Sequence, residues 1–428
     1  MNDIRRTILW VVFGFSMVLL WDQWQVYNGH KATFFPSPAK TAASAGSSAP
    51  ASAASGVPVA SATPASVPGA QVPGTTVPAA DQPAAPRQRI DITTDVLKLR
   101  FDSEGGTLVR SEFLKHADMA DRQKATVLMD ESRDRIYVAQ TGLIGGAFPT
   151  HKTPMTFTGE RALKDGANEL VVKFESADLG GVKLVKSYTF QRGSYAIGVK
   201  HEVINTGTAP VSPQLYLQLV RDGNKPPGES SFYYTFTGPA VYTHAKKYQK
   251  VEFRDIEKGK AEVEKTSPNG YVAMVQHYFA TAWLLADGVP RENFVRKVDN
   301  NLYAVGMITA LKDIAPGTAK AIESRFFVGP QEEKVLEALA PGLELVKDYG
   351  WLTILAKPLY WLLDQLHKLI NNWGWSIVAL VVLLKIAFYW LNAKAYASMA
   401  KMKAINPKIM EMRERLKDNP QQMQQEMM

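Results

Sequence analysis

A single lysine lies inside an otherwise uncharged apolar run near the end of the printed sequence. The run extends from Trp373 to Leu391, and Lys385 is its only charged residue. As a helix, residues 373–392 would be about 30 Å long, which matches the hydrocarbon core of a bilayer. A lysine at the bilayer centre costs at least about 2.5–3.5 kcal/mol, so its presence there needs a reason. The sequence therefore predicts a membrane protein in which Lys385 is the first candidate functional residue.

Residues that could carry out covalent chemistry are sparse and scattered. The seven histidines form no His-Glu-x-x-His motif and show no metal-ligand spacing. The 428 residues include no cysteine, which excludes disulfides, thiol catalysis and Cys-ligated zinc. A Ser-x-x-Lys pattern occurs at Ser398 and Lys401, but it follows the apolar run and no pocket is expected there. We therefore predict no catalytic residue, no metal site and no cofactor.

The N-terminal part reads as an anchor followed by a tether. Arg5 and Arg6 precede an apolar run that ends near Trp21, and small residues suited to signal-peptide cleavage come only much later. We expect an uncleaved transmembrane signal anchor at residues 1–22, in preference to a cleaved signal peptide. Residues 23–88 are expected to form an Ala/Pro-rich linker, because such a composition cannot bury enough side chain to offset its ordering entropy.

Residues 89–341 combine alternating or β-branched runs with glycine-rich turns, which is typical of a β-rich domain. Gly105-Gly106 and Gly180-Gly181 mark two of these turns. Because long strands follow one another with few helical stretches, we expect a large all-β antiparallel sandwich. The clearest strand signals are Ile90–Thr93, Val96–Phe101, Thr107–Leu114, Leu170–Phe174, Val182–Phe190, Tyr195–Val203, Leu215–Val220, Tyr271–Val275 and Ala321–Val328.

The periodicity becomes helical after the β-rich domain. Val335–Ala340 predicts a short helix, and residues 342–371 form an amphipathic region whose tryptophans and tyrosines favour the membrane interface. A soluble core helix would show the same pattern. Residues 372–393 are expected to be the second transmembrane helix.

Residues 394–428 predict a basic cytoplasmic helix that begins a helical hairpin. Asn406-Pro407 has the form of an N-cap followed by proline at the first position of a new helix. Apolar residues from Met402 to Leu416 recur at steps of three and four, as in a coiled-coil seam. The candidates for contact with cytoplasmic partners are Met399, Lys401, Met402, Lys403, Arg413 and Arg415.

The distribution of positive charge predicts the topology. The formal net charge of +8 is modest, and basic density beside a span more often sets topology than binds nucleic acid. Arg5 and Arg6 hold the N-terminus in the cytoplasm, and the basic residues from Lys394 onward hold the other end there. The linker and the β-rich domain are therefore expected on the periplasmic side, between two spans. No sequence-specific nucleic-acid recognition is expected.

Several motifs closely resemble bacterial YidC membrane insertases. They are Asp348-Tyr-Gly-Trp-Leu352, Asn372-Trp-Gly-Trp-Ser-Ile377, Lys394-Ala-Tyr-x-Ser-Met-Ala-Lys-Met402, Pro407-Lys-Ile409 and Met412-Arg-Glu-Arg-Leu416. The order of anchor, linker, β-domain, interfacial helix and second span is also similar to the Gram-negative form. The resemblance implies a periplasmic β-supersandwich, similar to the sugar-mutarotase fold, that serves as a docking module and not as a mutarotase.

The resemblance also implies a function. Such a chain would insert and fold proteins in the bacterial inner membrane through a hydrophilic groove, alone or with the Sec translocon. The implied partners are membrane-protein clients, the translocon, the ribosome or signal-recognition components, and the lipid bilayer. Lys385 stands where many relatives carry the groove's arginine, so the cation is retained without the bidentate fork. Relatives continue with a second hairpin helix and further spans, so we expect residues 1–428 to be a fragment of a multi-pass protein.

Other functions are compatible with parts of the sequence. A bitopic periplasmic protein could use the β-domain to bind carbohydrate or a partner, with its spans as plain anchors. A carbohydrate epimerase would rest on fold analogy alone and lacks a recognisable acid/base pair. Lys385 favours the insertase over a plain anchor, which has no need of a cation inside its span. Snorkelling of this lysine to the cytoplasmic headgroups is the structural alternative.

Overall fold

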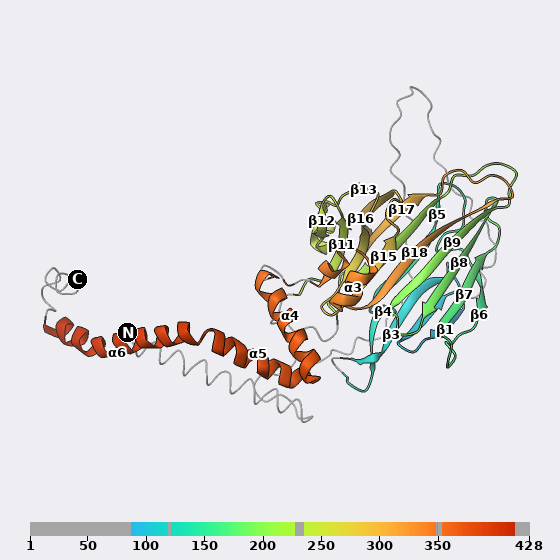
Figure 1. The fold of residues 1–428 in the computed structure, drawn as a ribbon. Helices are drawn as coiled ribbons and strands as arrows, with labels where there is room; N and C mark the ends of the chain where they lie inside the picture. The colour runs from blue at the N-terminus through green and yellow to red at the C-terminus, as the bar shows by residue number, and fades with distance from the viewer. Residues whose placement is uncertain (1–86, 119–120, 227–234, 348, 350–352, 416–428) are drawn as a thin grey trace, which may run out of the picture. The chain divides into compact units, whose positions relative to one another are not determined.

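The computed structural model describes residues 87–118, 121–226, 235–347, 349 and 353–415. Within these residues the strands form two antiparallel sheets of nine strands each (Figure 1). The first sheet has the order β1 (Arg89–Thr93), β2 (Leu97–Asp102), β3 (Thr107–Ala117), β4 (Ala125–Glu131), β5 (Ile136–Ile144), β10 (Gln214–Asp222), β17 (Leu302–Ala310), β16 (Arg291–Asp299) and β13 (Thr266–Ser267).

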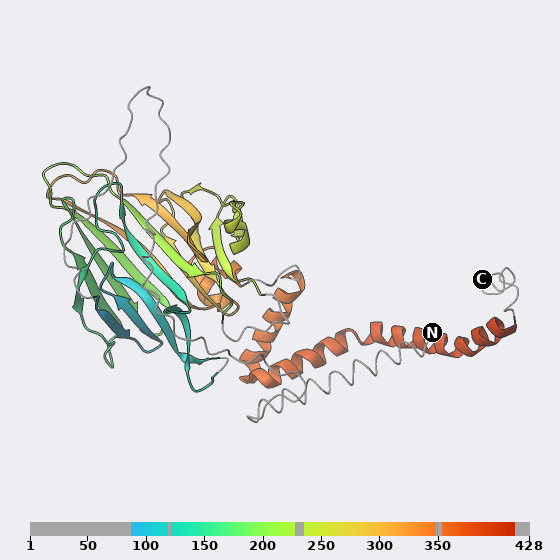
Figure 2. The ribbon, with the colours of Figure 1, turned by 180° about the vertical axis from the view of Figure 1, so that it is seen from behind.

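The second sheet also mixes early and late parts of the chain. Its order is β12 (Lys247–Lys250), β11 (Gly238–Thr243), β14 (Tyr271–Val275), β15 (Phe279–Leu285), β18 (Ala319–Pro330), β9 (Ala196–Asn205), β8 (Val182–Gln191), β7 (Glu169–Ser176) and β6 (Met155–Gly159). The reverse view in Figure 2 shows the blue-to-cyan strands β1 to β3 of the first sheet side by side. The expected all-β sandwich is confirmed, and each of the nine strand signals coincides with a strand.

The core lies between the sheets because successive side chains of a strand point to opposite faces. On β8, Val182, Leu184, Tyr188 and Phe190 point inward and are buried, as the alternating sequence predicts. Trp283 of β15 joins the same core and is 1% exposed. Removal of this apolar surface from water is the main force that holds the sheets together.

The Gly105-Gly106 turn fits its predicted role closely. Both residues have positive φ, 70° and 56°, a conformation that glycine adopts without steric cost. A side chain at Gly105 would also place its Cβ 2.2 Å from the carbonyl oxygen of His151. The turn between β2 and β3 therefore requires glycine for two independent reasons.

The helices follow the sandwich, apart from the short α2 (Phe253–Glu257). The predicted helix near Val335 is α3 (Glu333–Leu339), and the 3-10 helix η1 (Leu343–Val346) comes next. Leu336, Leu343 and Val346 pack on the outer face of β11, β14, β15 and β18, where they share a cluster with Tyr242 and Phe327. The remaining helices are α4 (Thr353–Ile370), α5 (Trp373–Ala387) and α6 (Tyr389–Arg415).

Two helix boundaries differ from the sequence-based expectation. The apolar run at 372–393 is divided, because α5 ends at Ala387 and Phe388 leaves the helical conformation with ψ of 6°. The prediction that a new helix begins at Asn406-Pro407 is wrong, since α6 runs through Pro407 to Arg415. Proline removes only one backbone hydrogen bond, and the helix continues on both sides of it despite the cost of about 3 kcal/mol.

Candidate functional site

Lys385 lies in the last turn of α5, and its side chain is exposed. Twelve residues separate it from Trp373 at the start of the helix, which is about 18 Å at 1.5 Å per residue. Every other residue of α5 is uncharged, and only Ser376 is buried. The structure therefore places this lysine on an open apolar helix.

The bend beyond Lys385 divides the apolar segment into two helices. Among the described residues, no single helix has both the length and the hydropathy of a membrane span. The pair Trp373–Ala387 and Tyr389–Pro407 meets those criteria together, with an angle of 59° at the break. The Phe388 N–H donates to the carbonyl oxygens of Leu384 and Ile386, which closes α5 before α6 begins.

The other predicted contact residues lie on α6, beyond the bend. Met399 and Met402 are 54% and 62% exposed, and Lys401 and Lys403 are also exposed. Lys385 belongs to a different helix and is not brought together with them. The backbones of residues 413 and 415 belong to α6, but the side chains of Arg413 and Arg415 lie outside the described part of the chain. The predicted anchor at 1–22 and nearly all of the linker are also outside it.

A capped corner joins α4 to α5. Asn371 has φ of 55°, and its N–H donates to the carbonyl oxygen of His367 at 2.7 Å, which ends α4. The Asn372 side chain then accepts a hydrogen bond from the Trp375 N–H at 3.2 Å and caps α5. The rings of His367 and Trp373 stack across the corner, with centroids 3.8 Å apart. Asparagine tolerates positive φ better than most residues, which explains its place at this corner.

The polar side of α4 contacts the end of the β-domain. Glu333, in the first turn of α3, accepts a 2.7 Å hydrogen bond from the Tyr349 hydroxyl. Its carboxylate also lies 3.7 Å from Nζ of Lys347 and 3.8 Å from Nζ of Lys357 on α4. The half-buried Glu333 carboxylate therefore contacts three side chains, two from the segment that leads into α4 and one from α4 itself.

A second carboxylate extends this contact along α4. Asp364 pairs with Lys334 of α3 at 2.8 Å and with Lys368 on its own helix at 3.2 Å. The hydrogen bond from Lys334, and then that from Lys368, hold the pKa of the Asp364 carboxyl below its ordinary value. Exposed ion pairs of this kind contribute little individually, so the contact depends on the group of charges acting together.

Several large apolar side chains of α4 are uncovered. Ile354 and Leu369 are 88% and 80% exposed, and Leu355 and Trp361 are exposed as well. Large apolar side chains exposed along one side of a helix mark a surface that binds lipid or protein. The exposed surface of α4 combines these apolar side chains with Lys357 and Lys368, and apolar residues beside lysines are typical of an interfacial helix.

Inside the β-domain, two basic residues missed by the sequence analysis meet a threonine of the facing sheet. Lys186 Nζ donates to the carbonyl oxygens of Gly105 and Thr141 at 2.6 and 2.7 Å. His201 Nε2 lies 3.0 Å from Oγ1 of the same threonine. Burial lowers the pKa of Lys186 to about 7, and burial followed by the charge of Lys186 holds the pKa of His201 well below its ordinary value. The alternation of β8 already placed Lys186 on the inward face, which is the signal that could have found it.

A second buried histidine lies beside the loop that follows β5. His151 Nδ1 is 2.5 Å from the Tyr216 hydroxyl, and burial, more than nearby cations, lowers the pKa of His151 to about 3. Lys186 and His201 are fully buried, so neither can reach a substrate. Among the described residues, no three His, Asp or Glu side chains gather as metal ligands would. We therefore expect these buried basic residues to affect the stability of the β-domain and not to take part in a reaction.

Comparison with known families matches both parts of the chain. The family model described as the YidC periplasmic domain matches residues 89–362, and the one described as the 60Kd inner membrane protein matches residues 365–428. A membrane protein insertase YidC from Cupriavidus taiwanensis is 52% identical over 429 residues, which cover 100% of this chain and 76% of the relative. The insertase YidC from Bordetella pertussis is 50% identical, with coverage of 100% and 76%.

This chain belongs to the YidC family of membrane protein insertases. It is therefore an inner-membrane protein with a periplasmic domain, and the prediction that it is not an enzyme is confirmed by the family. The alternative of a bitopic binding protein is not favoured.

Among solved structures, the β-domain of this YidC-family chain is similar to sugar-processing proteins at a low level. A galactose mutarotase-like protein from Lactobacillus casei has a TM-score of 0.37 and 10% identity, covering 56% of this chain and 100% of that one. A putative aldose 1-epimerase from Escherichia coli has a TM-score of 0.33 and 8% identity, covering 57% and 99%. A likeness of this extent says nothing about activity.

Proposed function

We propose that this YidC-family chain inserts and folds client proteins by means of a hydrophilic membrane groove in which Lys385 is the cation. The single observation that supports this role is the position of Lys385, exposed on an otherwise uncharged helix about 18 Å from its first residue. A cation at that depth attracts acidic or polar client segments, while the apolar segment of the client enters lipid. No covalent step is required.

The length of α5 supports a hydrated surrounding for Lys385. Fifteen residues make a helix of about 22 Å, which is shorter than the hydrocarbon core of about 30 Å. The bend at Phe388 follows three residues after the lysine, so the chain changes direction while still within membrane depth. Polar groups at such depth face water or protein and not lipid. The wall of the groove would come from other spans of the multi-pass protein.

The interfacial position of α4 is the second part of the proposal. Its exposed apolar side, including Ile354 and Leu369, would lie in the outer headgroup region, while Asp364 and Lys357 face α3. The capped corner at Asn371 and Asn372 then directs α5 into the bilayer. In this arrangement α4 supports the span and the β-domain at the same membrane surface.

The cytoplasmic side would receive clients through α6. Met399 and Met402 offer adaptable apolar surface beside Lys401 and Lys403, a combination suited to the ribosome or to signal-recognition components. Arg413 and Arg415 are proposed as further contact residues of the cytoplasmic side. Cooperation with the Sec translocon is proposed on the resemblance to the family, and independent insertion is the other mode.

Client insertion into proteoliposomes tests the function directly. Vesicles that contain the full-length protein should protect the translocated region of a single-span client from added protease. Empty vesicles, and vesicles with an unrelated single-span protein at equal density, serve as controls. Equal protection in all three preparations would reject the proposed function.

A further inference from the structure

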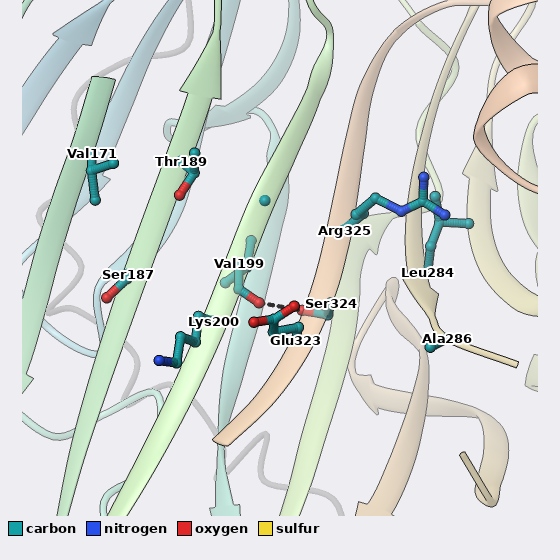
Figure 3. A pocket seen from close by; sticks show the side chains of 11 residues that line it. Val171, Ser187, Thr189, Val199, Lys200, Leu284, Ala286, Glu323, Ser324 and Arg325 are labelled. Atoms are coloured by element: carbon teal, nitrogen blue, oxygen red, sulfur yellow. Dashed lines mark hydrogen bonds between the residues drawn. The ribbon is translucent and has the colours of Figure 1, made fainter. Parts of the chain in front are cut away.

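Exposed apolar side chains of the β-domain gather at the end from which the chain continues to α4. Among the described residues of this domain, the large apolar or aromatic side chains that are exposed are Leu114, Ile136, Val171, Leu179, Tyr278 and Val335. Val171 is isolated, since the polar Ser187 and Thr189 stand beside it in Figure 3. Leu114, Tyr278 and Val335 instead lie close to the exit toward α4. Single exposed apolar residues are ordinary, whereas a group at one end marks an interaction surface.

One stacked pair of rings joins the β3–β4 hairpin to the β14–β15 turn. The rings of Phe113 and Phe279 have centroids 4.8 Å apart and an angle of 10° between them. Leu114 follows Phe113 and Tyr278 precedes Phe279, so these two exposed residues lie at the same level of the two sheets. The His277 ring stacks on Tyr278 with centroids 3.9 Å apart, which limits the rotation of the exposed tyrosine.

The stacked rings lie next to the exit toward α4. The Tyr278 carbonyl oxygen accepts a hydrogen bond from the Gln331 N–H at 2.9 Å. Gln331 precedes Glu333 by two residues, and the Glu333 carboxylate contacts α4. The turn is therefore only a few residues away from the helix that leads into the membrane. We call residues 113–124 and 276–279 the exit end of the β-domain.

The β3–β4 hairpin continues beyond the stacked rings and carries an unpaired cation at its tip. The strand extends to Ala117, four residues or roughly 13 Å past the rings. The carboxylates of the tip are engaged, because Asp121 pairs with Lys124 at 3.0 Å and Asp118 accepts the Asp121 N–H at 3.2 Å. Arg122 is exposed and, within the described part of the chain, makes no ion pair or hydrogen bond. Its guanidinium is therefore available to an anion.

Other charges near the exit end are of both signs. Asp95 accepts the Gly193 N–H at 2.9 Å and lies 3.9 Å from Nζ of Lys115. Glu332, directly before α3, is exposed. These carboxylates offset the lysines, so the exit end produces no strongly positive field that would gather acidic lipids. Contact with a membrane would depend on Arg122 and on the exposed apolar side chains, and zwitterionic lipid would be sufficient for it.

We propose that the exit end binds the periplasmic leaflet of the inner membrane, with Arg122 on a lipid phosphate and Leu114 and Tyr278 among the headgroups. Arginine forms two parallel hydrogen bonds with a phosphate, and tyrosine favours membrane interfaces because its ring is apolar and its hydroxyl is polar. The proposal rests on the interfacial position of α4 in the proposed function. It adds a second membrane contact, made by the β-domain itself, which fixes the orientation of that domain.

Quenching of a fluorescent label by nitroxide-bearing headgroups tests this inference. The chain has no cysteine, so Gln123→Cys provides a single label beside Arg122 in the full-length protein, with any cysteine beyond residue 428 changed to serine. The protein is held without client in phosphatidylcholine nanodiscs, with or without the nitroxide. Ala315→Cys is the distant control, because the twelve residues of β18 place it roughly 40 Å from the exit end. Leu369→Cys reports the position of α4.

The nitroxide should lower the emission of the Gln123→Cys label about twofold, because interfacial groups lie within about 10 Å of the headgroups. The Ala315→Cys label should keep its emission. Arg122→Glu combined with Tyr278→Ser should remove most of the quenching at position 123, whereas Arg122→Lys should retain it. The matched control combines Arg133→Glu with Leu179→Ser, two exposed positions away from the exit end, and should change nothing.

Two results would overturn the inference and leave the position of α4 intact. One is quenching of the Leu369→Cys label without quenching of the Gln123→Cys label, as expected if the exit end binds a protein that the nanodiscs lack. The other is unchanged quenching at position 123 in Arg122→Glu with Tyr278→Ser. An unquenched Leu369→Cys label would reject the interfacial position of α4 and this inference with it. Because no client is present, a failure of insertion produces none of these results.

Discussion

Lys186 on β8 and His201 on β9 are directly opposite each other in the strand register, and both side chains reach Thr141 of the facing sheet. The two residues thus form a polar link between the sheets within a mainly apolar core. Buried basic groups without a carboxylate are costly when charged. The stability of the β-domain should therefore depend on pH through these two residues.

We predict that Lys186→Met flattens the alkaline part of the stability profile. Burial lowers the folded-state pKa of Lys186 from 10.5 to about 7. Between these values the unfolded chain binds the additional proton, so the free energy of unfolding rises with pH by up to about 1.4 kcal/mol per unit. Urea unfolding of the β-domain at pH 7 to 10, followed by pulse proteolysis, measures this slope. Lys183→Met on the outer face of β8 is the control and should retain it, and a wild-type slope in Lys186→Met would contradict the assignment.

The acid side of the profile should depend on His201 together with His151, since burial lowers the pKa of both histidines. The folded-state pKa of His201 lies well below 6.5. As the pH falls through 6.5, His201 therefore binds a proton in the unfolded chain but stays neutral in the folded domain. Stability is therefore lost below this value. His201→Gln should reduce the loss between pH 6.5 and 4.5 by up to about 1.4 kcal/mol per unit. The matched control is His244→Gln at an exposed position, and an equal effect of both variants would show that His201 is not responsible.

The contact between α3 and the segment before α4 should protect that segment from proteolysis. Glu333→Ala removes the acceptor of the Tyr349 hydroxyl and the carboxylate near Lys347. We expect tryptic cleavage after Lys347 to become roughly fivefold faster, which corresponds to the loss of about 1 kcal/mol. Mass spectrometry of timed digests measures the rate. Glu337→Ala, exposed on the same helix, should leave cleavage unchanged, and identical rates in both variants would argue against the contact.

The β-domain should not be required for insertion itself. The proposed groove lies in the membrane, and a domain on the periplasmic side cannot reach the bilayer centre. Deletion of residues 100–320 in the full-length protein should leave substantial insertion of a single-span client. Membrane extraction with alkaline carbonate checks that the shortened protein remains embedded. Complete loss of insertion by a stably embedded protein would contradict this division of roles.

The alternation of apolar and polar residues predicted about half of the strands in the sandwich. Many of the other strands are buried on both faces and lack this pattern. On β8 the inward and outward residues alternate, so the strand was visible in the sequence. On β5 and β17 nearly every residue is buried, so neither strand shows a regular alternation of apolar and polar residues in the sequence. Sequence analysis predicted the antiparallel sandwich but could not give the order of the strands within each sheet.

The candidate sites were predictable to different degrees. Lys385 could be identified as a candidate from the sequence alone, because a single charged residue within an apolar run is visible there. The bend at Phe388 had no signal, since residues 384–391 include neither glycine nor proline. The partners of Lys186 lie 81 and 45 residues away, on strands whose pairing only the fold determines. Leu114 and Tyr278 became related only through the stacking of their neighbours Phe113 and Phe279.

The most direct test of the proposed mechanism compares client insertion by Lys385 variants of the full-length protein. Lys385→Arg should insert clients at the normal rate, because it keeps a cation on the exposed side of α5. Lys385→Ala and Lys385→Glu should slow insertion roughly tenfold or more, the effect of about 1.4 kcal/mol, while the protein stays in the membrane. If Lys385→Ala inserts every tested client at the normal rate, Lys385 is only a snorkelling anchor and the groove assignment fails.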